Sequence, residues 1–278
     1  MRCETFGDDW LAMDLPFACE IHASEPRQGK DPASKRVLSI FSEPKLLMVR
    51  DEWVRAHHRQ FDLIVTYDER LLDLPNARRL YFGGCWCDRP PSRKDFAVTF
   101  LLSTGCGHPH LDGYRLRKQV PALLDKGLLP ARLFLSSRRL ALSPDEHASL
   151  NTIIAGGRVP SFRIKEDKAP LFEGMFHIAV ENARDESYFS EKLIDCFRTF
   201  TVPIYYGSRS VAGIFDESGI IFVDGIEALE AKLSSLSPQD YWDRLAVMHK
   251  NHAIAARFLD PVANLRQLLI EQFGGRPS

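Results

Sequence analysis

The stretch FHIAVENARDESYFSEKLIDCFRTFTVPIYYG, from Phe176 to Gly207, predicts a strand, a loop, a helix and a second strand. Its two apolar runs, Phe176–Val180 and Val202–Tyr206, have the length and composition of buried strands. Between them, apolar residues recur at helical spacing: Leu193, Ile194, Phe197 and Phe200. This βαβ unit is typical of an open sheet with parallel strands.

Polar residues gather where the first of these strands should end and where the helix should begin, and they are Glu181, Asn182, Tyr188, Glu191 and Lys192. Open α/β sheets bind ligands in the crevice beyond the carboxyl ends of their strands. A lysine near a helix start suits a phosphate, and a neighbouring carboxylate can accept the hydrogen bonds of a ribose. On spacing alone, however, an ordinary solvated helix start is the commoner explanation.

The rest of the chain also alternates predicted strands and helices, which favours parallel sheets. The other predicted strands are Val37–Phe41, Leu63–Tyr67, Arg78–Phe82, Phe96–Leu102, Ala131–Leu135 and Gly219–Val223. The other predicted helices are Leu46–Phe61, Leu116–Leu124, Ile226–Leu233, Pro238–Leu259 and Asp260–Phe273, with Glu146–Arg158 a helix or an extended insertion. Residues 1–34 are weakly patterned.

A proline pair within Arg89–Lys94 marks the best candidate for a linker between domains. We therefore expect one α/β domain over residues 1–90 and a second α/β domain, with closing helices, over residues 91–278. Two such halves suggest the GT-B architecture, in which two Rossmann-like domains face each other across a cleft.

Composition excludes several classes of protein. A formal net charge of -1 among 278 residues does not suit a general nucleic-acid binder. The sequence has no apolar run close to the roughly 20 residues of a membrane span. The acidic start MRCETFGDDW does not have the order of a signal peptide, so we expect a cytoplasmic protein.

The six cysteines are expected to be reduced thiols, as is usual in cytosolic proteins. Cys85 and Cys87, with Cys106, His108 and His110, have spacings that fit no common structural zinc site. We therefore expect no bound metal.

The pattern EN(x5)Y(x2)EKL(x2)C followed by TVPIYYG resembles the donor-binding motif of the α-1,3-fucosyltransferase family, in its soluble bacterial form. The resemblance covers roughly Arg36 to Val223. It implies the GT-B fold, with an acceptor-side domain over residues 1–90 and a nucleotide-sugar-binding domain over residues 91–278. It also implies transfer of fucose from GDP-fucose to a hydroxyl of a glycan acceptor, with inversion of the anomeric centre.

The same resemblance implies that Asn182, Tyr188, Glu191 and Lys192 contact the donor, with Glu181 in a supporting role. Arg117 stands where the family places a phosphate-binding arginine, although a shift of two residues to Arg115 is possible. A planar guanidinium can clamp a diphosphate with two parallel hydrogen bonds. Positive charge from Arg117 and Lys192 would stabilise the leaving diphosphate, so that no metal is obligatory.

The segment SIFSE, from Ser39 to Glu43, resembles the family's strand that ends in a glutamate, which makes Glu43 the candidate catalytic base. Pro44 follows it where the family usually has an asparagine, so a surface glutamate is a live alternative. Glu69, His108 and His110 are the other candidates for the base.

Two further functions fit the sequence. The chain could use a different nucleotide sugar, because these residues do not identify the base of the nucleotide. It could also be a catalytically inactive homologue that still binds a nucleotide. The sequence does not name the acceptor.

Overall fold

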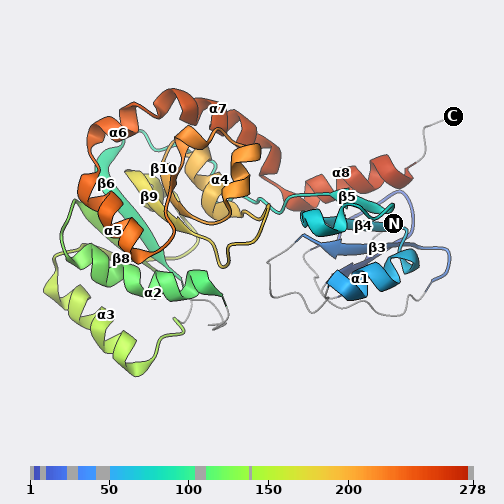
Figure 1. Cartoon of the computed structure of the whole chain (residues 1–278), viewed down its shortest axis with the longest axis horizontal. Coiled ribbons are helices and arrows are strands. Elements are labelled where there is room, and N and C mark those ends of the chain that lie inside the picture. Colours follow the sequence, from blue (N-terminus) through green and yellow to red (C-terminus); the bar gives the residue numbers. More distant parts are fainter. Residues whose placement is uncertain are drawn as a thin grey trace. The chain divides into compact units, whose positions relative to one another are not determined.

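The computed structural model describes residues 3–6, 11–23, 31–41, 51–103, 111–137 and 140–274. The chain forms two compact units, each with its own parallel sheet (Figure 1). The first unit comprises Met1–Gly84, Asp185–Tyr188 and Asp260–Ser278, and the second comprises Cys85–Arg184 and Phe189–Leu259. Among the helices of these described ranges, none is long and apolar enough to cross a membrane. The cytoplasmic location stays a prediction.

This division differs from the prediction in two ways. The first stretch of the first unit ends at Gly84, so the predicted linker Arg89–Lys94 lies inside the second unit. Gly83 and Gly84 at the boundary have φ angles of 60° and 91°, which glycine adopts without steric cost. The segment from Asp260, predicted to lie in the second domain, belongs to the first unit because its helix buries apolar residues in that unit's core.

The sheet of the first unit has five parallel strands in the order β1-β2-β3-β4-β5. They are β1 (Glu4–Phe6), β2 (Cys19–Ala23), β3 (Lys35–Ile40), β4 (Leu63–Thr66) and β5 (Ala77–Arg79). The sequence predicted the last three strands to within a few residues. It did not predict β1 and β2, which lie in the weakly patterned part of the chain.

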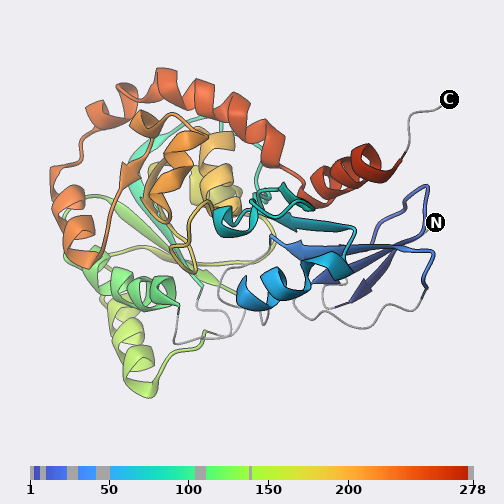
Figure 2. The same cartoon turned by 45° about the vertical axis from the view of Figure 1, so that its right-hand side comes forward.

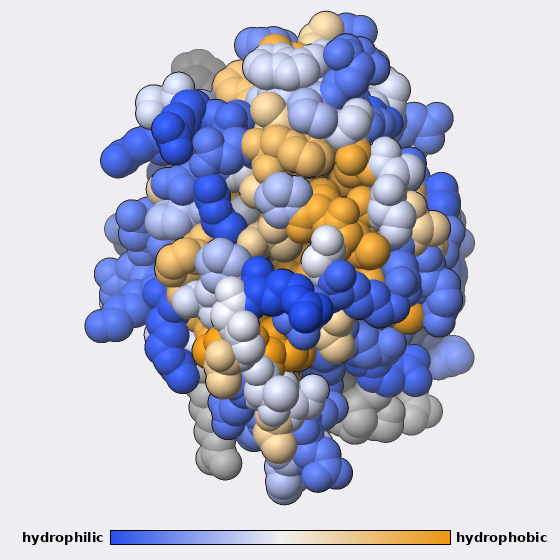
Figure 3. Space-filling view, turned by 90° about the vertical axis from the view of Figure 1, so that its left-hand side faces the viewer, coloured by the Kyte–Doolittle hydropathy of each residue, from blue (hydrophilic) through white to orange (hydrophobic). Residues whose placement is uncertain are grey.

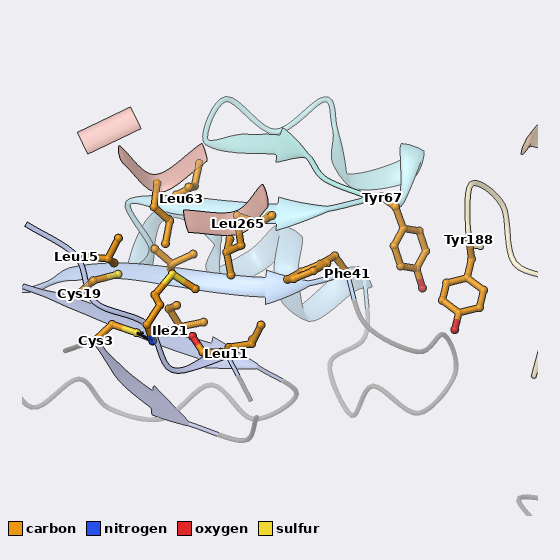
Figure 4. Packing of buried hydrophobic residues seen from close by; sticks show 14 residues of the cluster. Cys3, Leu11, Leu15, Cys19, Ile21, Phe41, Leu63, Tyr67, Tyr188 and Leu265 are labelled. Atoms are coloured by element: carbon orange, nitrogen blue, oxygen red, sulfur yellow. Dashed lines mark hydrogen bonds between the residues drawn. The ribbon is translucent and has the colours of Figure 1, made fainter. Parts of the chain in front are cut away.

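Helices cover both faces of this sheet (Figure 2). On one face, Leu265 and Leu269 of α8 (Pro261–Phe273) pack into a core with residues of β2, β3 and β4. Figure 4 shows this core. On the other face, Val54 of α1 (Asp51–His57) and Leu71 of the short helix η3 (Glu69–Leu71) pack against Leu38 and Ile64. The short helix η2 (His58–Gln60) follows α1 directly.

The sheet of the second unit has six parallel strands in the order β11-β10-β9-β6-β7-β8. They are β6 (Asp95–Leu102), β7 (Ala131–Ser136), β8 (Ser161–Ile164), β9 (Gly174–Val180), β10 (Val202–Tyr206) and β11 (Ile221–Phe222). The strand order reverses between β6 and β9, which lie side by side. This is the strand order of the Rossmann fold, and the reversal is its topological switch point.

The helices of the second unit form two groups, since α2 packs with α3 and α5, while α4 packs with α7. They are α2 (Asp112–Asp125), α3 (Pro144–Gly156), α4 (Glu191–Arg198), α5 (Ile226–Ser235), α6 (Pro238–Trp242) and α7 (Leu245–Ala255). The short helices are η4 (Ala169–Phe172), η5 (Arg209–Gly213), η6 (Glu217–Gly219) and η7 (Ala256–Phe258). The predicted closing helix Pro238–Leu259 is therefore three shorter helices.

Local sequence explains where α3 begins and ends. Ser143 and Glu146 form a capping box, in which each side chain accepts a hydrogen bond from the other residue's backbone N–H. Gly157 ends the helix with a φ angle of 66°. The helical alternative for Glu146–Arg158 is thus confirmed.

One face of the second unit carries an apolar area with hydrophilic side chains around it (Figure 3). Separately, a cavity of about 550 Å³ lies at the amino ends of β6 and β7. Its lining includes Phe96 and Val159 as well as the guanidinium-bearing Arg132 and Arg158. This cavity is at the edge of the sheet opposite to the one where a nucleotide is expected.

Candidate functional site

A buried arginine joins the two strand ends at the switch point of the second unit. Arg117 of α2 is 4% exposed. Its Nε donates to the carbonyl of Val180 at 3.1 Å, Nη1 to the carbonyl of Ser103 at 3.2 Å, and Nη2 to Oδ1 of Asn182 at 2.7 Å. The guanidinium therefore braces the carboxyl ends of β6 and β9 and orients Asn182. Contact of Arg117 with a phosphate stays a prediction.

The start of α2 lies directly against the end of β9. The backbone N–H of Gly113 donates to the carbonyl of Asn182 at 3.2 Å. A Cβ atom at Gly113 would collide with the carbonyl oxygen of Glu181 and lie 2.9 Å from that of Asn182. Only glycine fits this approach of helix to strand. The sequence analysis missed Gly113 because the predicted helix began at Leu116.

The carboxylate of Glu181 closes the loop between β9 and α4. It is completely buried. Its Oε1 accepts from the backbone N–H of Ser190 at 2.9 Å, and its Oε2 accepts from the Ser190 hydroxyl at 2.7 Å. The hydroxyl of Tyr205 also donates to Oε1, at 3.3 Å. Burial raises the pKa of Glu181 above its ordinary value. The two ends of the loop are thereby fixed to each other.

The first turn of α4 places a positive charge beside this buried carboxylate. Ser190 is the N-cap, and the Nζ of Lys192 lies 2.8 Å from Oε1 of Glu191 and 3.7 Å from Oε2 of Glu181. Burial lowers the pKa of Lys192, but the two carboxylates outweigh it and leave the pKa raised. The ammonium therefore stays charged at neutral pH. Its side chain is 23% exposed, so part of it can meet a ligand.

A second polar group at the same edge of the sheet was missed by the sequence analysis. The hydroxyl of Tyr206, the last residue of β10, donates to Oδ2 of Asp112 at 3.0 Å. Arg184 lies 3.1 Å from Asp224, which also pairs with Arg209 at 2.8 Å. Tyr206 ends β10, Arg184 and Asp224 lie in loops that follow strands, and Asp112 and Arg209 begin α2 and η5. Their positions shortly after predicted strands were the signal that the sequence offered.

Tyr188 belongs to a different unit from the other predicted donor residues. Asp185–Tyr188 belongs to the first unit, whereas Arg117, Asn182 and the start of α4 belong to the second. The side chain of Tyr188 is buried in the core of the first unit, next to Tyr67 (Figure 4). Donor contact by Tyr188 stays a prediction.

The predicted base Glu43 lies outside the described residues, as do His108 and His110. Glu69 is described, and its Oε2 accepts from Nη2 of Arg79 at 2.7 Å. The hydrogen bonds from Arg79 lower the pKa of Glu69, which makes its carboxylate a weaker base. Glu43 as the base stays a prediction.

Among the described residues, no disulfide joins any two of Cys3, Cys19, Cys85, Cys87 and Cys196. Within the described ranges no three or more His, Cys, Asp or Glu side chains come together as a metal site would require. Cys106 lies outside those ranges. Metal independence of the reaction stays a prediction.

Comparisons with known proteins give one related sequence and several related folds. No family model matches the chain. The α-(1,3)-fucosyltransferase FucT of Helicobacter pylori is 28% identical over 120 residues, which are 42% of this chain and 24% of that protein. The chain thus spans about a quarter of the length of the curated relative that it matches.

Among solved structures, Anabaena HepE in complex with UDP-glucose has a TM-score of 0.60 at 12% identity and covers 87% of this chain and 72% of its own. TarM has a TM-score of 0.58 at 10% identity, with 93% and 55% of the two chains covered. These likenesses and the two parallel sheets define the fold as that of the GT-B glycosyltransferases, which confirms the predicted fold class. The sequence similarity to the Helicobacter pylori enzyme confirms, in addition, the resemblance to the α-1,3-fucosyltransferase family.

Proposed function

We propose that this chain is a glycosyltransferase that moves fucose from GDP-fucose to a hydroxyl of a glycan acceptor, with inversion of the anomeric centre. The observation that carries the proposal is the group of Asn182, Glu191 and Lys192 at the switch point of the second unit. Ligands of open parallel sheets bind at such points. These residues are also among those that the resemblance to the fucosyltransferases assigns to the donor.

In the proposed reaction, a base removes the proton of the acceptor hydroxyl while the oxygen of that hydroxyl attacks the anomeric carbon of the donor sugar. The bond from that carbon to the diphosphate breaks on the opposite face, and GDP leaves with the electron pair. Glu43 is the proposed base and takes up the proton. The base lowers the activation barrier by removing the acceptor's proton, and the positive charge lowers it by stabilising the leaving diphosphate.

The charges at the switch point support this division of roles. Lys192 combines a charged, partly exposed ammonium with the positive end of α4, and both favour a phosphate there. Glu191 is the proposed acceptor for the ribose hydroxyls. Arg117 is the proposed second cation, and in its described contacts it already holds Asn182 in place.

Calorimetric titration of the full chain with GDP and with UDP tests the donor class. UDP is the control nucleotide because Anabaena HepE, which has a similar fold, was solved in complex with UDP-glucose. We expect GDP to bind more tightly than UDP, and GDP-fucose to be slowly hydrolysed or transferred. Tighter binding of UDP would favour a different nucleotide sugar. Binding of GDP without turnover on any acceptor sugar would favour an inactive homologue.

The cationic account of leaving-group stabilisation has its own test. Because side chains are proposed to carry the charge, transfer should continue at a similar rate in excess EDTA. The measurement is the release of GDP in the presence and absence of the chelator. Complete loss of transfer, restored by manganese or magnesium, would contradict this part of the proposal.

A further inference from the structure

The cavity of about 550 Å³ at the amino edge of the second unit's sheet uses none of the residues of the proposed nucleotide site. Its lining comes from the first residues of β6 and β7, from the turn between α2 and β7, and from the turn between α3 and β8. All of these segments belong to the second unit. Sites for small molecules usually have volumes of roughly 300–1,000 Å³, so this cavity is large enough for one.

The most buried side chains of the lining are apolar. Ala97, Leu124 and Val159 are each 3% exposed. Phe96 and Leu129 add larger apolar side chains that are partly exposed. Transfer of apolar surface from water to such surroundings is favourable, so we expect an occupant to have an apolar body.

One arginine of the lining is already paired with carboxylates. Nη2 of Arg132 donates to Oδ2 of Asp95, which also lines the cavity, at 2.6 Å. Nη1 of Arg132 lies 3.4 Å from Oε2 of Glu173. The hydrogen bond from Arg132 lowers the pKa of Asp95, which therefore stays ionised at neutral pH. The charges of Arg132 and Asp95 thus largely cancel, and neither attracts a further ion strongly.

A second arginine of the lining, Arg158, has no such partner. Its Nη1 donates to the carbonyl of Asp125, the last residue of α2, at 2.6 Å, as basic side chains often do at a helix end. In the part of the chain that the structure describes, no carboxylate pairs with Arg158, and its Nε and Nη2 have no hydrogen-bond partner. These two nitrogens share one side of the guanidinium and match the two oxygens of a carboxylate.

We propose that this cavity binds a small molecule with an apolar body and one carboxylate. The apolar body contacts Ala97, Leu124 and Val159, and the carboxylate accepts hydrogen bonds from Nε and Nη2 of Arg158. A cationic ligand is disfavoured, because Arg158 would repel it and the carboxylate of Asp95 is already paired. The inference does not depend on the proposed function, since the site lies at the edge of the sheet opposite to the nucleotide.

The test is calorimetric titration of the full chain with three probes that share an eight-carbon chain: octanoate, 1-octanol and octylammonium. We expect octanoate to bind about three- to tenfold more tightly than 1-octanol, the effect of a partly exposed charge pair with two hydrogen bonds. Octylammonium should bind more weakly than 1-octanol. Equal affinity for octanoate and 1-octanol, or tighter binding of octylammonium, would overturn the assignment of a carboxylate.

Two variants locate the probes. Arg158→Met keeps an apolar side chain and removes the charge, so it should bind octanoate no more tightly than 1-octanol while its affinity for 1-octanol stays unchanged. Ala131→Phe places a ring in the lining at the start of β7 and should weaken binding of both probes at least tenfold. Arg158→Met alters no buried residue, so it tests the proposal even if Ala131→Phe does not fold.

A matched control separates the cavity from general attraction of an anion to a basic surface. Lys126 follows the last residue of α2 and pairs with Glu230 of α5 at 2.6 Å, and it is not part of the lining. Lys126→Met should bind octanoate within about twofold of the wild type. Loss of octanoate affinity in Lys126→Met as large as in Arg158→Met would overturn the proposal. Unchanged octanoate affinity in a folded Ala131→Phe protein would overturn it as well.

Discussion

The two sheets of this chain are built from the same parallel strands but differ in strand order. In the first unit the described strands follow the order of the chain, from β1 to β5. In the second unit the order reverses between β6 and β9. A reversal sends the connections on its two sides to opposite faces of the sheet, which leaves a crevice at the carboxyl ends. The nucleotide site is therefore expected in the second unit.

The strand ends of the two units also differ in chemistry. In the first unit, aromatic side chains follow the ends of β4 and β5, where Tyr67 and Phe82 pack with Tyr188. In the second unit, buried polar side chains stand at the ends of β6 and β9, with Arg117 and Glu181 among them. Burying such groups is costly unless they are hydrogen-bonded, as these are. Clusters of this kind are frequent at functional sites, which supports the proposed nucleotide site at this edge.

The largest expected effect tests whether the first unit supplies the base. Glu43→Gln keeps the shape of the side chain but cannot take a proton from the acceptor. Turnover should fall by about 10²–10⁴-fold, the usual contribution of a general base. GDP affinity, which belongs to the second unit in this account, should barely change. The measurement is steady-state transfer to an acceptor sugar, together with calorimetry of GDP binding.

A Glu43→Gln enzyme of near-normal rate would remove Glu43 from the mechanism. Attention would then turn to Glu69, His108 and His110, each substituted in the same way.

A smaller effect tests the close approach at the switch point. Gly113→Ala should destabilise the protein by about 1–3 kcal/mol, since its Cβ collides with the carbonyl of Glu181. Gly156, the last residue of α3, is the matched control, because a Cβ there meets nothing within 4 Å. Gly156→Ala should leave stability unchanged or slightly raised. Denaturant unfolding measures both, and equal stability of the two variants would contradict the described packing.

The pH dependence of stability tests the interior of the second sheet. His177 of β9 contacts the hydroxyl of Thr99 at 2.8 Å, and burial lowers its pKa from 6.5 to about 3. The unfolded chain therefore binds a proton on His177 near pH 6.5, and the folded chain does so only near pH 3. The stability that neutral His177 contributes is present above pH 6.5 and is lost as the pH falls.

By pH 5 this loss should reach about 1–2 kcal/mol. The variant His177→Gln has no titrating side chain at this position. The difference in unfolding free energy between wild type and variant therefore gives the pH-dependent contribution of the His177 imidazole. Parallel pH profiles for the two proteins between pH 7 and 4 would show that the imidazole does not titrate in this way.

Apolar runs made part of the fold predictable. The strands β6, β9 and β10 are nearly continuous apolar segments, and each was predicted within two residues of its bounds. By contrast, β2 carries Glu20 and His22, which are buried with their side chains 3.6 Å apart. Because polar residues occupy buried positions of β2, its sequence lacks the apolar pattern from which a strand is predicted.

The site was predictable where the contacts are local. Lys192, Glu191 and Glu181 fall within a single βαβ unit, so their approach follows from the order of the elements. The burial of Tyr188 depends on its packing against Tyr67, which is far away in the sequence. The pairing of Asp224 with Arg184 and Arg209 likewise depends on which strands become neighbours. Periodicity within one segment carries no information about such contacts.

The central claim is that the switch point of the second unit binds the nucleotide. Its most direct test is calorimetric titration of GDP into wild type, Lys192→Ala and Lys118→Ala. Lys118 is the matched control, since it is a lysine of α2 that pairs with Glu146 of α3. We predict that Lys192→Ala weakens GDP binding by about 1–3 kcal/mol, the cost of a charged hydrogen bond, while Lys118→Ala binds as the wild type does. Equal GDP affinity in all three proteins would contradict the claim.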